Sequence, residues 1–386
     1  MGRLEELIQE FCLDGVNHIA IGQLIKQKRI ITITPSIKIK RNDYLVDGAT
    51  PIISQEAEYI SGYCNLADKN IPKDNYVCFG DHSEHIKFID FAFVQGADGL
   101  KIMRTDETVL SARYLFHAAS SLYCRHNNYE RHFKYFTDTI IPLPPLAVQQ
   151  EIVRILDSFT ELTAELTAEL TARRKQYEHY RDELLTFGDD VPSLPISQIA
   201  TFKYGYTDKA QDAGDARFIR ITDITDDGCL NPLDAKYINM TEESKKYLLT
   251  KGDLLLARTG ASYGKTLYYP DNSQAVYASF LIKIKPDNTK ILNRFYWHFS
   301  KSSLYWTQAE KLVSKGGQQQ FNTGAIGRVL IPVPSLDEQR RIVSILDRFD
   351  AICNDLASGL PAEIAARQKQ YEYYRDKLLM FKELER

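Results

Sequence analysis

Apolar residues recur every three or four positions along two long stretches of the chain. The first stretch runs from Ile152 to Phe187 and the second from Ile342 to Phe381. This spacing places the apolar side chains on one face of a helix, and about 36 residues of helix span about 54 Å. We therefore predict two long helices that pack on each other as an antiparallel coiled coil. Gly359 and Pro361 interrupt the second stretch, so a kink or a restart with Pro361 in the first turn is expected there.

The two helical stretches are copies of each other. The segment Ile152–Phe159 returns 190 residues later as Ile342–Phe349, and Arg173–Leu185 returns 194 residues later as Arg367–Leu379. A proline-rich segment precedes each copy and marks the joint between a helix and the preceding module. A period near 190 is far too long for a solenoid and indicates duplication of a half-protein.

The first helical stretch also contains a tandem tetrapeptide. Thr163-Ala164-Glu165-Leu166 is followed directly by the same four residue types at Thr167–Leu170, and the second stretch has no such repeat. One such unit adds about 6 Å of helix and rotates the downstream residues by roughly 40°. It can be inserted or deleted with little damage to the apolar stripe. The alternative is ordinary helix filler, because Ala, Glu and Leu are good helix formers.

Each helical stretch follows a module, and the sequences of the two modules differ. The second module reads as strands at Phe218–Thr222, Asp253–Arg258 and Tyr277–Ile284 with a helix around Phe295–Phe299. The first module reads similarly, and its predicted elements are Tyr76–Phe79, Lys87–Val94, Leu100–Met103 and the helix Ala112–Leu122. Residues 3–12 resemble the tail of a connector moved to the front of the chain. The predicted fold class is α+β, with two α+β domains alternating with two long helices in a pseudo-two-fold repeat.

This pattern divides the chain into four parts. We expect a first module with its N-terminal helix (1–146), a central connector (147–188), a second module (189–336) and a distal connector (337–386). The whole chain has a net charge of −3, but residues 190–329 carry +4 and residues 15–139 carry +1. The modules are thus the less acidic parts, which is a weak indication of binding to nucleic acid.

Composition narrows the class of protein. Apolar content of 44% and aromatic content of 11% are typical of a globular chain. The six cysteines are scattered without a CxxC pair, which favours a reducing, cytoplasmic location over a disulfide framework or a zinc site. The charged N-terminus is not a signal peptide, and no apolar run is long enough to span a membrane.

Three motifs resemble catalytic or metal sites without fulfilling their requirements. Gly260–Thr266 has three residues between its glycines where a phosphate loop needs four, so a surface turn or a DNA-contacting loop is favoured. Asn231–Asp234 lacks the aromatic residue of an amino-methyltransferase motif, and the chain has no Gly-rich S-adenosylmethionine loop. His82 and His85 could bind a metal, but no third ligand is near. We predict no catalytic residues and no metal site.

The connectors carry a resemblance to a known family. Pro-x-Pro segments followed by Gln, Ile-Val and Ile-Leu-Asp motifs, most clearly in Pro332–Ile342, resemble the specificity subunit of a type I restriction–modification enzyme. The tandem Thr-Ala-Glu-Leu units resemble the subfamily that carries this tetrapeptide spacer. The modules match only in outline. In the first copy Ala147–Gln150 lacks the acidic pair Asp337-Glu338, and Tyr129–His132 replaces the Gln-rich loop of the second module.

The resemblance implies a non-catalytic, prokaryotic and cytoplasmic subunit that binds double-stranded DNA. Each module is expected to be a target-recognition domain that reads one half of a bipartite, asymmetric site. The connectors would separate the halves and dock two methyltransferase subunits, which bind S-adenosylmethionine and methylate adenine at N6. Motor-nuclease subunits, which use ATP and Mg²⁺, would join them, and no cofactor is expected on this chain. Adenine methylation requires a flipped base in a cofactor pocket, which this chain lacks.

Side chains in the module loops are the candidate DNA contacts, because Arg reads guanine, Gln and Asn read adenine, and Lys mostly meets phosphate. In the second module they are Arg217, Arg220, Arg258, Ser262, Tyr263, Lys265, Lys315, Gln318, Gln319, Gln320 and Asn322. In the first module they are His82, Ser83, His85, Lys87, Arg125, His126, Asn128, Tyr129, Arg131 and His132. For each of them the alternative is a solvated surface residue.

Repeated residues near the ends of the two helical stretches are the candidate docking surface. A pair of identical partners needs the same patch twice. The residues are Gln176, Tyr177, Tyr180, Arg181, Gln370, Tyr371, Tyr374 and Arg375. The alternative for Tyr177 and Tyr371 is packing in the seam of the coil. Two other classes stay open on sequence alone: a coiled-coil scaffold whose modules bind protein, and a self-sufficient methyltransferase.

Overall fold

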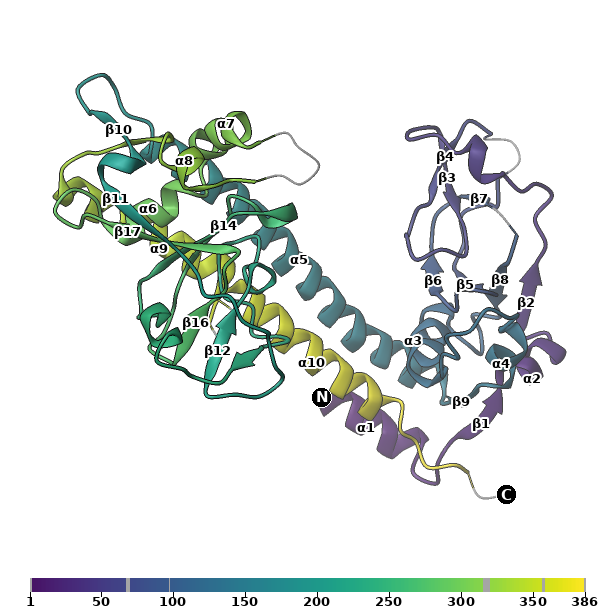
Figure 1. The fold of residues 1–386 in the computed structure, drawn as a ribbon. Helices are drawn as coiled ribbons and strands as arrows, with labels where there is room; N and C mark the ends of the chain where they lie inside the picture. The colour runs from purple at the N-terminus through teal and green to yellow at the C-terminus, as the bar shows by residue number, and fades with distance from the viewer. Residues whose placement is uncertain (1, 67–69, 97, 315–319, 356–357, 385–386) are drawn as a thin grey trace. The chain divides into compact units, whose positions relative to one another are not determined.

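The computed structural model describes residues 2–66, 70–96, 98–314, 320–355 and 358–384 (Figure 1). The chain divides into two compact units. Unit 1 comprises Met1–Glu165 with Ala365–Arg386, and unit 2 comprises Leu166–Ile364. Each unit therefore contains one module and parts of both connectors.

The connectors are helical, as the apolar spacing predicts. The central connector is one helix of 39 residues, α5 (Leu146–Leu184). The distal connector is two helices, α9 (Leu336–Asn354) and α10 (Leu360–Leu378). The predicted restart with Pro361 in the first turn is confirmed. A Cβ at Gly359 would lie 2.6 Å from the carbonyl oxygen of Ala351, so the break itself requires glycine.

The helices run antiparallel within each unit. In unit 1, Leu156 near the start of α5 shares a core with Leu378 at the end of α10, and Phe159 stacks on Tyr374 at 5.4 Å. In unit 2, Tyr180 near the end of α5 stacks on Phe349 of α9 at 5.5 Å. The predicted antiparallel packing is thus present in both units.

Unit 1 builds its module from short strands and the helices α1 to α4. The elements are α1 (Gly2–Phe11), β1 (Asn17–Ala20), α2 (Ile21–Lys26), β2 (Ile30–Ile33), the 3₁₀ turn η1 (Arg41–Asp43), β3 (Thr50–Ile53), β4 (Gly62–Cys64), β5 (Tyr76–Gly80), β6 (Ile86–Ile89), β7 (Val94–Gln95), β8 (Leu100–Thr105), α3 (Ala112–Leu122), α4 (Phe133–Asp138) and β9 (Ile140–Leu143).

Unit 2 contains a module of similar content. The elements are β10 (Ser193–Pro195), η3 (Ile196–Gln198), β11 (Ala200–Tyr204), β12 (Ala216–Ile219), η4 (Ile221–Asp223), β13 (Tyr237–Ile238), η5 (Ser244–Tyr247), β14 (Leu254–Ala257), η6 (Gly260–Ser262), β15 (Thr266–Tyr268), β16 (Ala275–Tyr277), β17 (Leu281–Pro286), α6 (Asn293–Phe299), α7 (Ser303–Leu312), α8 (Thr323–Ile326) and β18 (Leu330–Pro332).

The two modules share one sheet topology despite their different sequences. A four-stranded antiparallel sheet has the order β2-β8-β5-β6 in unit 1 and β11-β17-β14-β15 in unit 2. A three-stranded sheet has the order β4-β3-β7 or β13-β12-β16, with one antiparallel and one parallel pair in each. A two-stranded sheet, β1-β9 or β10-β18, joins the ends of each module. The duplication therefore includes the modules.

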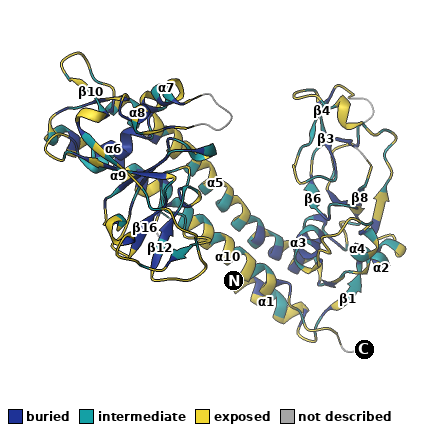
Figure 2. Cartoon of the chain, viewed as in Figure 1, coloured by how far each residue is buried: buried dark blue, intermediate teal, exposed yellow. Residues whose placement is uncertain are grey.

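Two predicted strands are wrong in the same way. Tyr277–Ile284 is in fact β16 and β17, and Lys87–Val94 is β6 and β7, with each pair divided between two sheets. β7 and β16 are buried throughout, β17 is buried at four of six positions and β6 at two of four, and apolar residues continue through the segment between the members of each pair (Figure 2). Burial on both sides of a turn hides the boundary from a reading of apolar periodicity.

The prediction for residues 3–12 requires a correction. They form α1, but α10 and not α1 takes the position in unit 1 that the end of α5 takes in unit 2. Tyr371 of α10 contacts the module helix α3 through His117, as Tyr177 of α5 contacts α6 through His298. The chain ends also meet here, because the Val16 N–H donates to the Lys382 carbonyl at 2.9 Å.

Candidate nucleic-acid interface and helical connectors

The loops that follow β14 and α7 meet in unit 2. Thr259 forms a β-bridge with Gln320, and the N–H of Phe321 donates to the carbonyl of Arg258 at 2.7 Å. Phe321 is fully buried and anchors this junction in the core. The segment after Arg258 and residues 320–322, far apart in sequence, therefore lie side by side.

Arg258 is held by two aromatic rings at this junction. Its guanidinium lies 5.2 Å from the ring centroid of Tyr204 and 5.5 Å from that of Phe280, and its Nε donates to the Ser279 carbonyl at 3.2 Å. Tyr204 is 41% exposed and Phe280 51% exposed. A planar group stacked between exposed rings loses little further freedom when it binds, which suits bidentate recognition of a base.

Other predicted residues of the second module lie close by. Tyr263 packs against Trp306 and Phe321, and Ser262 ends the turn η6 beside it. The side chain of Asn322 accepts the N–H of Ala325 at 3.0 Å and caps α8. Gln320 is exposed. The Gly260–Thr266 segment is a turn between β14 and β15, with Gly260 and Gly264 at positive φ, and not a phosphate loop.

Two arginines predicted to contact DNA instead form ion pairs or hydrogen bonds inside the module. Arg220 forms an ion pair with Asp223 at 2.8 Å and a second one with Asp234 at 3.3 Å. Arg217 donates to the carbonyl of Asn231. We therefore omit Arg217 and Arg220 from the DNA surface proposed below. Lys315, Gln318 and Gln319 lie outside the described residues.

Glu84 organises the corresponding loops of unit 1. This carboxylate is 3% exposed and accepts the Tyr123 hydroxyl at 2.6 Å and the N–H groups of His126 and Asn127, each at 2.8 Å. Burial alone would raise the pKa of Glu84, but these hydrogen bonds outweigh it and lower the pKa to about 2. The loop at 81–85 and the loop at 123–132 are thereby joined.

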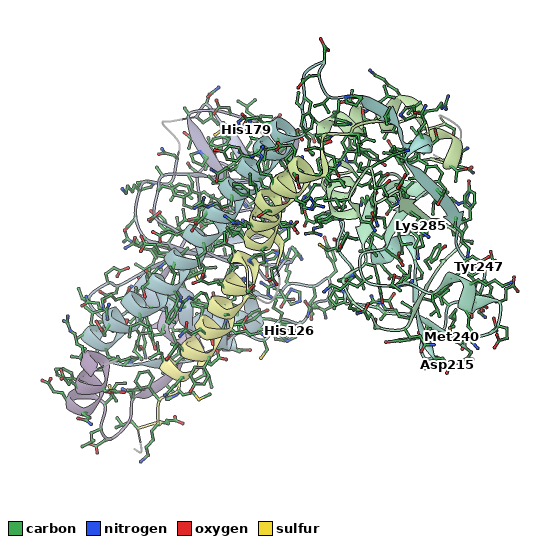
Figure 3. The ribbon with its side chains drawn as sticks, turned by 90° about the vertical axis from the view of Figure 1, so that its left-hand side faces the viewer. His126, His179, Asp215, Met240, Tyr247 and Lys285 are labelled. Atoms are coloured by element: carbon green, nitrogen blue, oxygen red, sulfur yellow. The ribbon has the colours of Figure 1, made fainter. Side chains whose placement is uncertain are left out.

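The ten predicted residues of the first module fall into two groups. Buried Lys87 donates to the carbonyls of Ser54, at 2.9 Å, and Glu58, and buried His132 contacts the Asn128 side chain at 2.7 Å. We leave Lys87 and His132 out of the proposed surface, together with Ser83, which donates to the Gln55 carbonyl, and half-buried His85. The exposed group is Arg125, His126, Asn128, Tyr129 and Arg131, with His82 stacked on Tyr129. Figure 3 labels His126.

Two lysines that the sequence reading missed lie beside this group. Lys101 of β8 and Lys38 line a groove with His82 and Arg131. Lys101 approaches Asp81 at 3.5 Å, and Lys38 pairs with Asp98 at 2.6 Å. The burial of β8 does not alternate, because Met103, on the same face as Lys101 by the period of two, is buried. The sequence pattern therefore gave no signal for Lys101.

The repeated tyrosines of the connectors serve mainly in packing. Tyr177 is 4% exposed, and its hydroxyl contacts Nδ1 of His298 at 3.1 Å. Tyr371 is half-buried and contacts Nδ1 of His117 at 3.4 Å. Arg181 and Arg375 lie over these two rings. Tyr177 and Tyr371 therefore have a packing role, although each of them joins a connector to a module and does not only pack in the seam of the coil.

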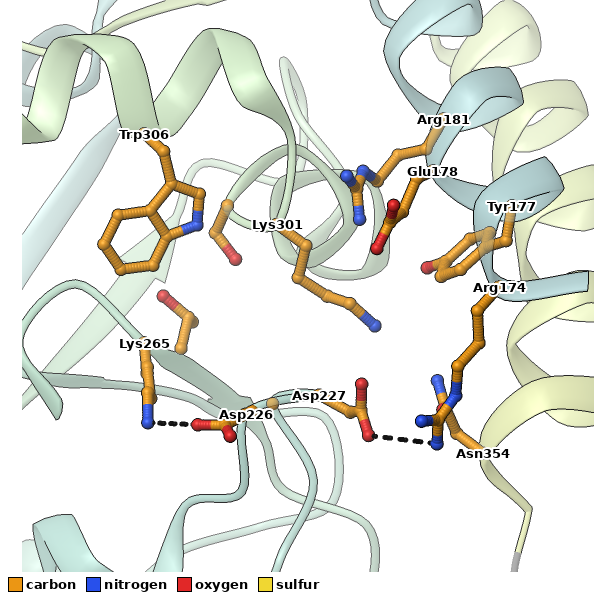
Figure 4. A pocket seen from close by; sticks show the side chains of 13 residues that line it. Arg174, Tyr177, Glu178, Arg181, Asp226, Asp227, Lys265, Lys301, Trp306 and Asn354 are labelled. Carbon is orange, nitrogen blue, oxygen red and sulfur yellow. Dashed lines mark hydrogen bonds and ion pairs between the residues drawn. The ribbon is translucent and has the colours of Figure 1, made fainter. Parts of the chain in front are cut away.

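A cavity of about 280 Å³ lies between α5 and the module within unit 2 (Figure 4). Arg174 and Arg181 of α5 face it, as do Asp226, Asp227 and Lys265 of the module. Arg174 approaches Asp227 at 3.9 Å, and Lys265 pairs with Asp226. The predicted DNA contact Lys265 is thus committed to an ion pair at the edge of this cavity.

The joint between module and connector contains a polar cluster that the sequence reading missed. In unit 2, Arg294 and His298 of α6 both reach Oδ1 of Asp347 in α9, each at 2.7 Å. Because a carboxylate only accepts, the ring donates from Nε2, and the Nδ1 of the neutral ring accepts the Tyr177 hydroxyl. An Arg-x-x-x-His pair occurs in both module helices, so aligning α3 with α6 could have found it.

Acid should destabilise unit 2 through His298. Burial lowers the pKa of this ring to about 4, although its hydrogen bond to Asp347 opposes the shift and Arg294 and Lys301 add to it. An unfolded histidine has a pKa of about 6.5, so between these values only the unfolded state takes up the proton. Stability is complete above pH 6.5 and falls as the pH drops towards 4, by about 2 kcal/mol at pH 5.

Urea unfolding at pH 7.5 and pH 5 measures this loss. Both tryptophans, Trp297 and Trp306, belong to unit 2, so their fluorescence follows its unfolding. His298→Gln should remove most of the difference between the two pH values. His179→Gln, an exposed histidine of α5 labelled in Figure 3, should leave it unchanged. An equal loss in His298→Gln and the unmodified protein would contradict this assignment.

Comparison with known proteins now identifies the family. A family model described as the type I restriction modification DNA specificity domain matches the chain twice, over residues 6–173 and 189–366. The chain belongs to this family. These are specificity subunits of type I restriction enzymes, which recognise DNA and are not catalytic.

Individual relatives of the specificity-subunit family cover much of the chain. It is 29% identical over 421 residues to the EcoR124I/EcoR124II specificity subunit of Escherichia coli, covering 99% of this chain and 97% of that protein. It is 35% identical over 257 residues to a putative type I specificity subunit of Haemophilus influenzae, covering 62% of this chain and 63% of that protein. The S subunit from M. genitalium matches in structure with a TM-score of 0.62 at 15% identity, covering 95% and 96% of the two chains. This last likeness supports the fold alone.

Membrane spans and metal clusters are both absent from the described ranges of the chain. No helix there has the length and apolar character needed to cross a bilayer. No group of three or more His, Cys, Asp or Glu side chains in the same ranges is arranged to hold a metal ion.

Proposed function

We propose that this specificity subunit reads a bipartite, asymmetric DNA target, with each module reading one half. The observation that carries the proposal is that two modules of one sheet topology present different loop chemistry. Unit 1 offers His, Tyr and Arg side chains, and unit 2 offers Arg258 beside Gln320 and Asn322. Two modules with the same sheet topology but different loop side chains suit recognition of two different half-sites. We propose that the two modules expected from the sequence are the two recognition domains, and that the expected connectors separate them.

The proposed contact residues are those that the loops leave accessible. Arginine and amide side chains would read base edges, and lysines would meet phosphate. In unit 2 they are Arg258, Ser262, Tyr263, Gln320 and Asn322. In unit 1 they are Arg125, His126, Asn128, Tyr129 and Arg131, with His82 at the edge.

The connectors would dock two methyltransferase subunits, one at each repeated segment. Tyr177 and Tyr371 contribute little surface, so we assign docking to the accessible repeated residues. They are Gln176, Tyr180, Gln370 and Tyr374, to which we add the exposed pairs Lys175/Lys369 and Glu178/Glu372. The methyltransferase subunits would bind S-adenosylmethionine and methylate adenine at N6. Motor-nuclease subunits would bring ATP and Mg²⁺.

A purified complex with one methyltransferase per chain would contradict the two-site proposal.

Binding of the full chain, with its methyltransferase partners, to double-stranded DNA at two salt concentrations tests the proposal. Basic side chains that displace counterions make affinity fall steeply with salt. We therefore expect tight binding at 50 mM salt that is weaker by at least about tenfold at 200 mM on non-specific DNA. A protein scaffold would show no DNA binding at either concentration. S-adenosylmethionine bound to this chain alone would favour a self-sufficient methyltransferase.

A further inference from the structure

The same polar cluster holds each module to its connectors. In unit 1, Arg113 and His117 of α3 both contact Asp157 of α5, each at 2.9 Å. In unit 2, Arg294 and His298 of α6 both contact Asp347 of α9, each at 2.7 Å. A tyrosine hydroxyl from a second connector segment completes each chain of contacts, at 3.4 Å in unit 1 and 3.1 Å in unit 2. We call these clusters the module joints: Arg113, His117, Asp157 and Tyr371 in unit 1, and Arg294, His298, Asp347 and Tyr177 in unit 2.

Each module joint connects three helical segments. Arginine and histidine come from the module helix, aspartate from the segment that leaves the module, and tyrosine from the antiparallel segment beside it. His117 is 1% exposed and His298 is 0% exposed. Charge-assisted hydrogen bonds to a buried ring have narrow angular limits. A module joint therefore fixes the orientation of a module on its connectors and not only its attachment.

A repeated glutamine adds a second anchor beside each joint. Gln149 accepts the N–H of Ser111 at 2.9 Å and donates to the Val109 carbonyl at 2.9 Å. Gln339 accepts the N–H of Leu292 at 2.9 Å and donates to the Lys290 carbonyl at 2.8 Å. Both glutamines form hydrogen bonds with the backbone just before the module helix. The joint and the glutamine therefore oppose rotation of the module at two points.

Aromatic rings stiffen the arginines of the joints. The guanidinium of Arg113 lies 4.6 Å from the Phe88 ring centroid and 5.3 Å from that of Phe116, and the guanidinium of Arg294 lies 4.8 Å from the Tyr268 centroid and 3.9 Å from that of Trp297. In each unit one ring comes from a strand of the four-stranded sheet and the other from the module helix. The repeated pair of rings restrains the joint arginine in both units, which supports a role for the joints in module orientation.

We propose that the module joints are positioning elements that set how strictly the complex enforces the distance between the two half-sites. This inference rests on the proposed bipartite recognition. A spacer changed by one base pair demands about 3.4 Å of translation and about a tenth of a turn between the bound halves. Rigid joints oppose that movement, and loosened joints permit it without changing any base-reading side chain.

Spacer tolerance measured in cells tests the proposal. A host lacking this chain receives the unmodified gene or a variant, together with plasmids whose half-sites are separated by the normal spacer or by one base pair more or less. Asp157→Asn and Asp347→Asn, alone and together, remove the shared carboxylate charge. Single-molecule sequencing then gives the methylation at each spacer. We expect the ratio of altered-spacer to normal-spacer methylation to rise about tenfold in the double variant and less in the single ones, with unchanged half-site bases.

A surface ion pair provides the matched control. Asp337→Asn disrupts an exposed pair with Arg340 on α9 and should leave the ratio unchanged. If an aspartate variant fails to fold, as judged by thermal unfolding, Tyr177→Phe with Tyr371→Phe decides, because only two hydroxyl groups are removed. A general loss of stability lowers methylation at all spacers equally. An unchanged ratio in folded joint variants overturns the inference, whereas absence of any bipartite methylation with the unmodified gene overturns the proposed function.

Discussion

Insertion of one further Thr-Ala-Glu-Leu unit after Leu170 should lengthen the recognised spacer by about one base pair and leave both half-sites unchanged. The unit lies within the continuous helix α5, where Leu166 and Leu170 are half-buried and the intervening residues are exposed. Four residues therefore extend the helix without removing a fully buried contact.

The length and the rotation that the inserted unit adds together favour a spacer longer by one base pair. The insertion adds about 6 Å of helix and roughly 40° of rotation. Duplex DNA rises about 3.4 Å per base pair, so length alone would accommodate up to about two base pairs. The rotation is close to the twist of a single step at about 10–10.5 base pairs per turn. One added base pair is the best compromise, with the remainder absorbed by bending.

Methylome sequencing of a strain carrying the inserted unit measures this result. Deletion of one existing unit should shorten the spacer by about one base pair, which gives a paired test in the opposite direction. Glu165→Gln is a suitable control, since it changes the same segment without changing its length. Altered half-site bases, or a spacer that does not change, would contradict a ruler function for α5.

Replacing Arg258 with alanine should weaken binding to the half-site read by unit 2 by about 1–3 kcal/mol, the worth of a bidentate contact to guanine. At the middle of that range affinity falls about thirtyfold. Arg258 is stacked between Tyr204 and Phe280 and already oriented. We also expect discrimination at one base position to relax while the other half-site keeps its sequence.

Competition binding with every single-base variant of the target measures both effects. Arg340→Ala, an exposed arginine at the start of α9, should leave affinity and specificity unchanged. Gln320→Ala should relax a different position, since an amide pairs with adenine. A uniform loss across all sequences would instead indicate a phosphate contact for Arg258.

The sequence predicted the connectors better than the modules, for physical reasons. Helical periodicity, Gly359 and Pro361 define α5, α9 and α10 because they act over neighbouring residues. Periodicity merges the strand pairs β6/β7 and β16/β17 because apolar residues continue through the segment between the two members of each pair. Division of a buried apolar run between two sheets depends on distant pairing partners, which periodicity does not contain.

The same distinction between local sequence signals and distant partners applies to the candidate site residues. Residue type selected Gln320, which is exposed, and Arg258, which is half-buried; their contact with DNA stays a prediction. Residue type did not show that Arg220 and Lys265 already have carboxylate partners. Repetition of Tyr177 and Tyr371 suggested a surface, yet it reflects two equivalent joints. Partners that are distant in sequence decide which charged groups remain available.

The central claim is that one chain specifies both halves of a split methylation target. Methylome sequencing of the host with the gene intact, deleted and restored tests it most directly. The account predicts N6-methyladenine at one asymmetric bipartite motif that disappears on deletion and returns on restoration. An unchanged methylome after deletion, or loss of a single uninterrupted motif, would contradict it.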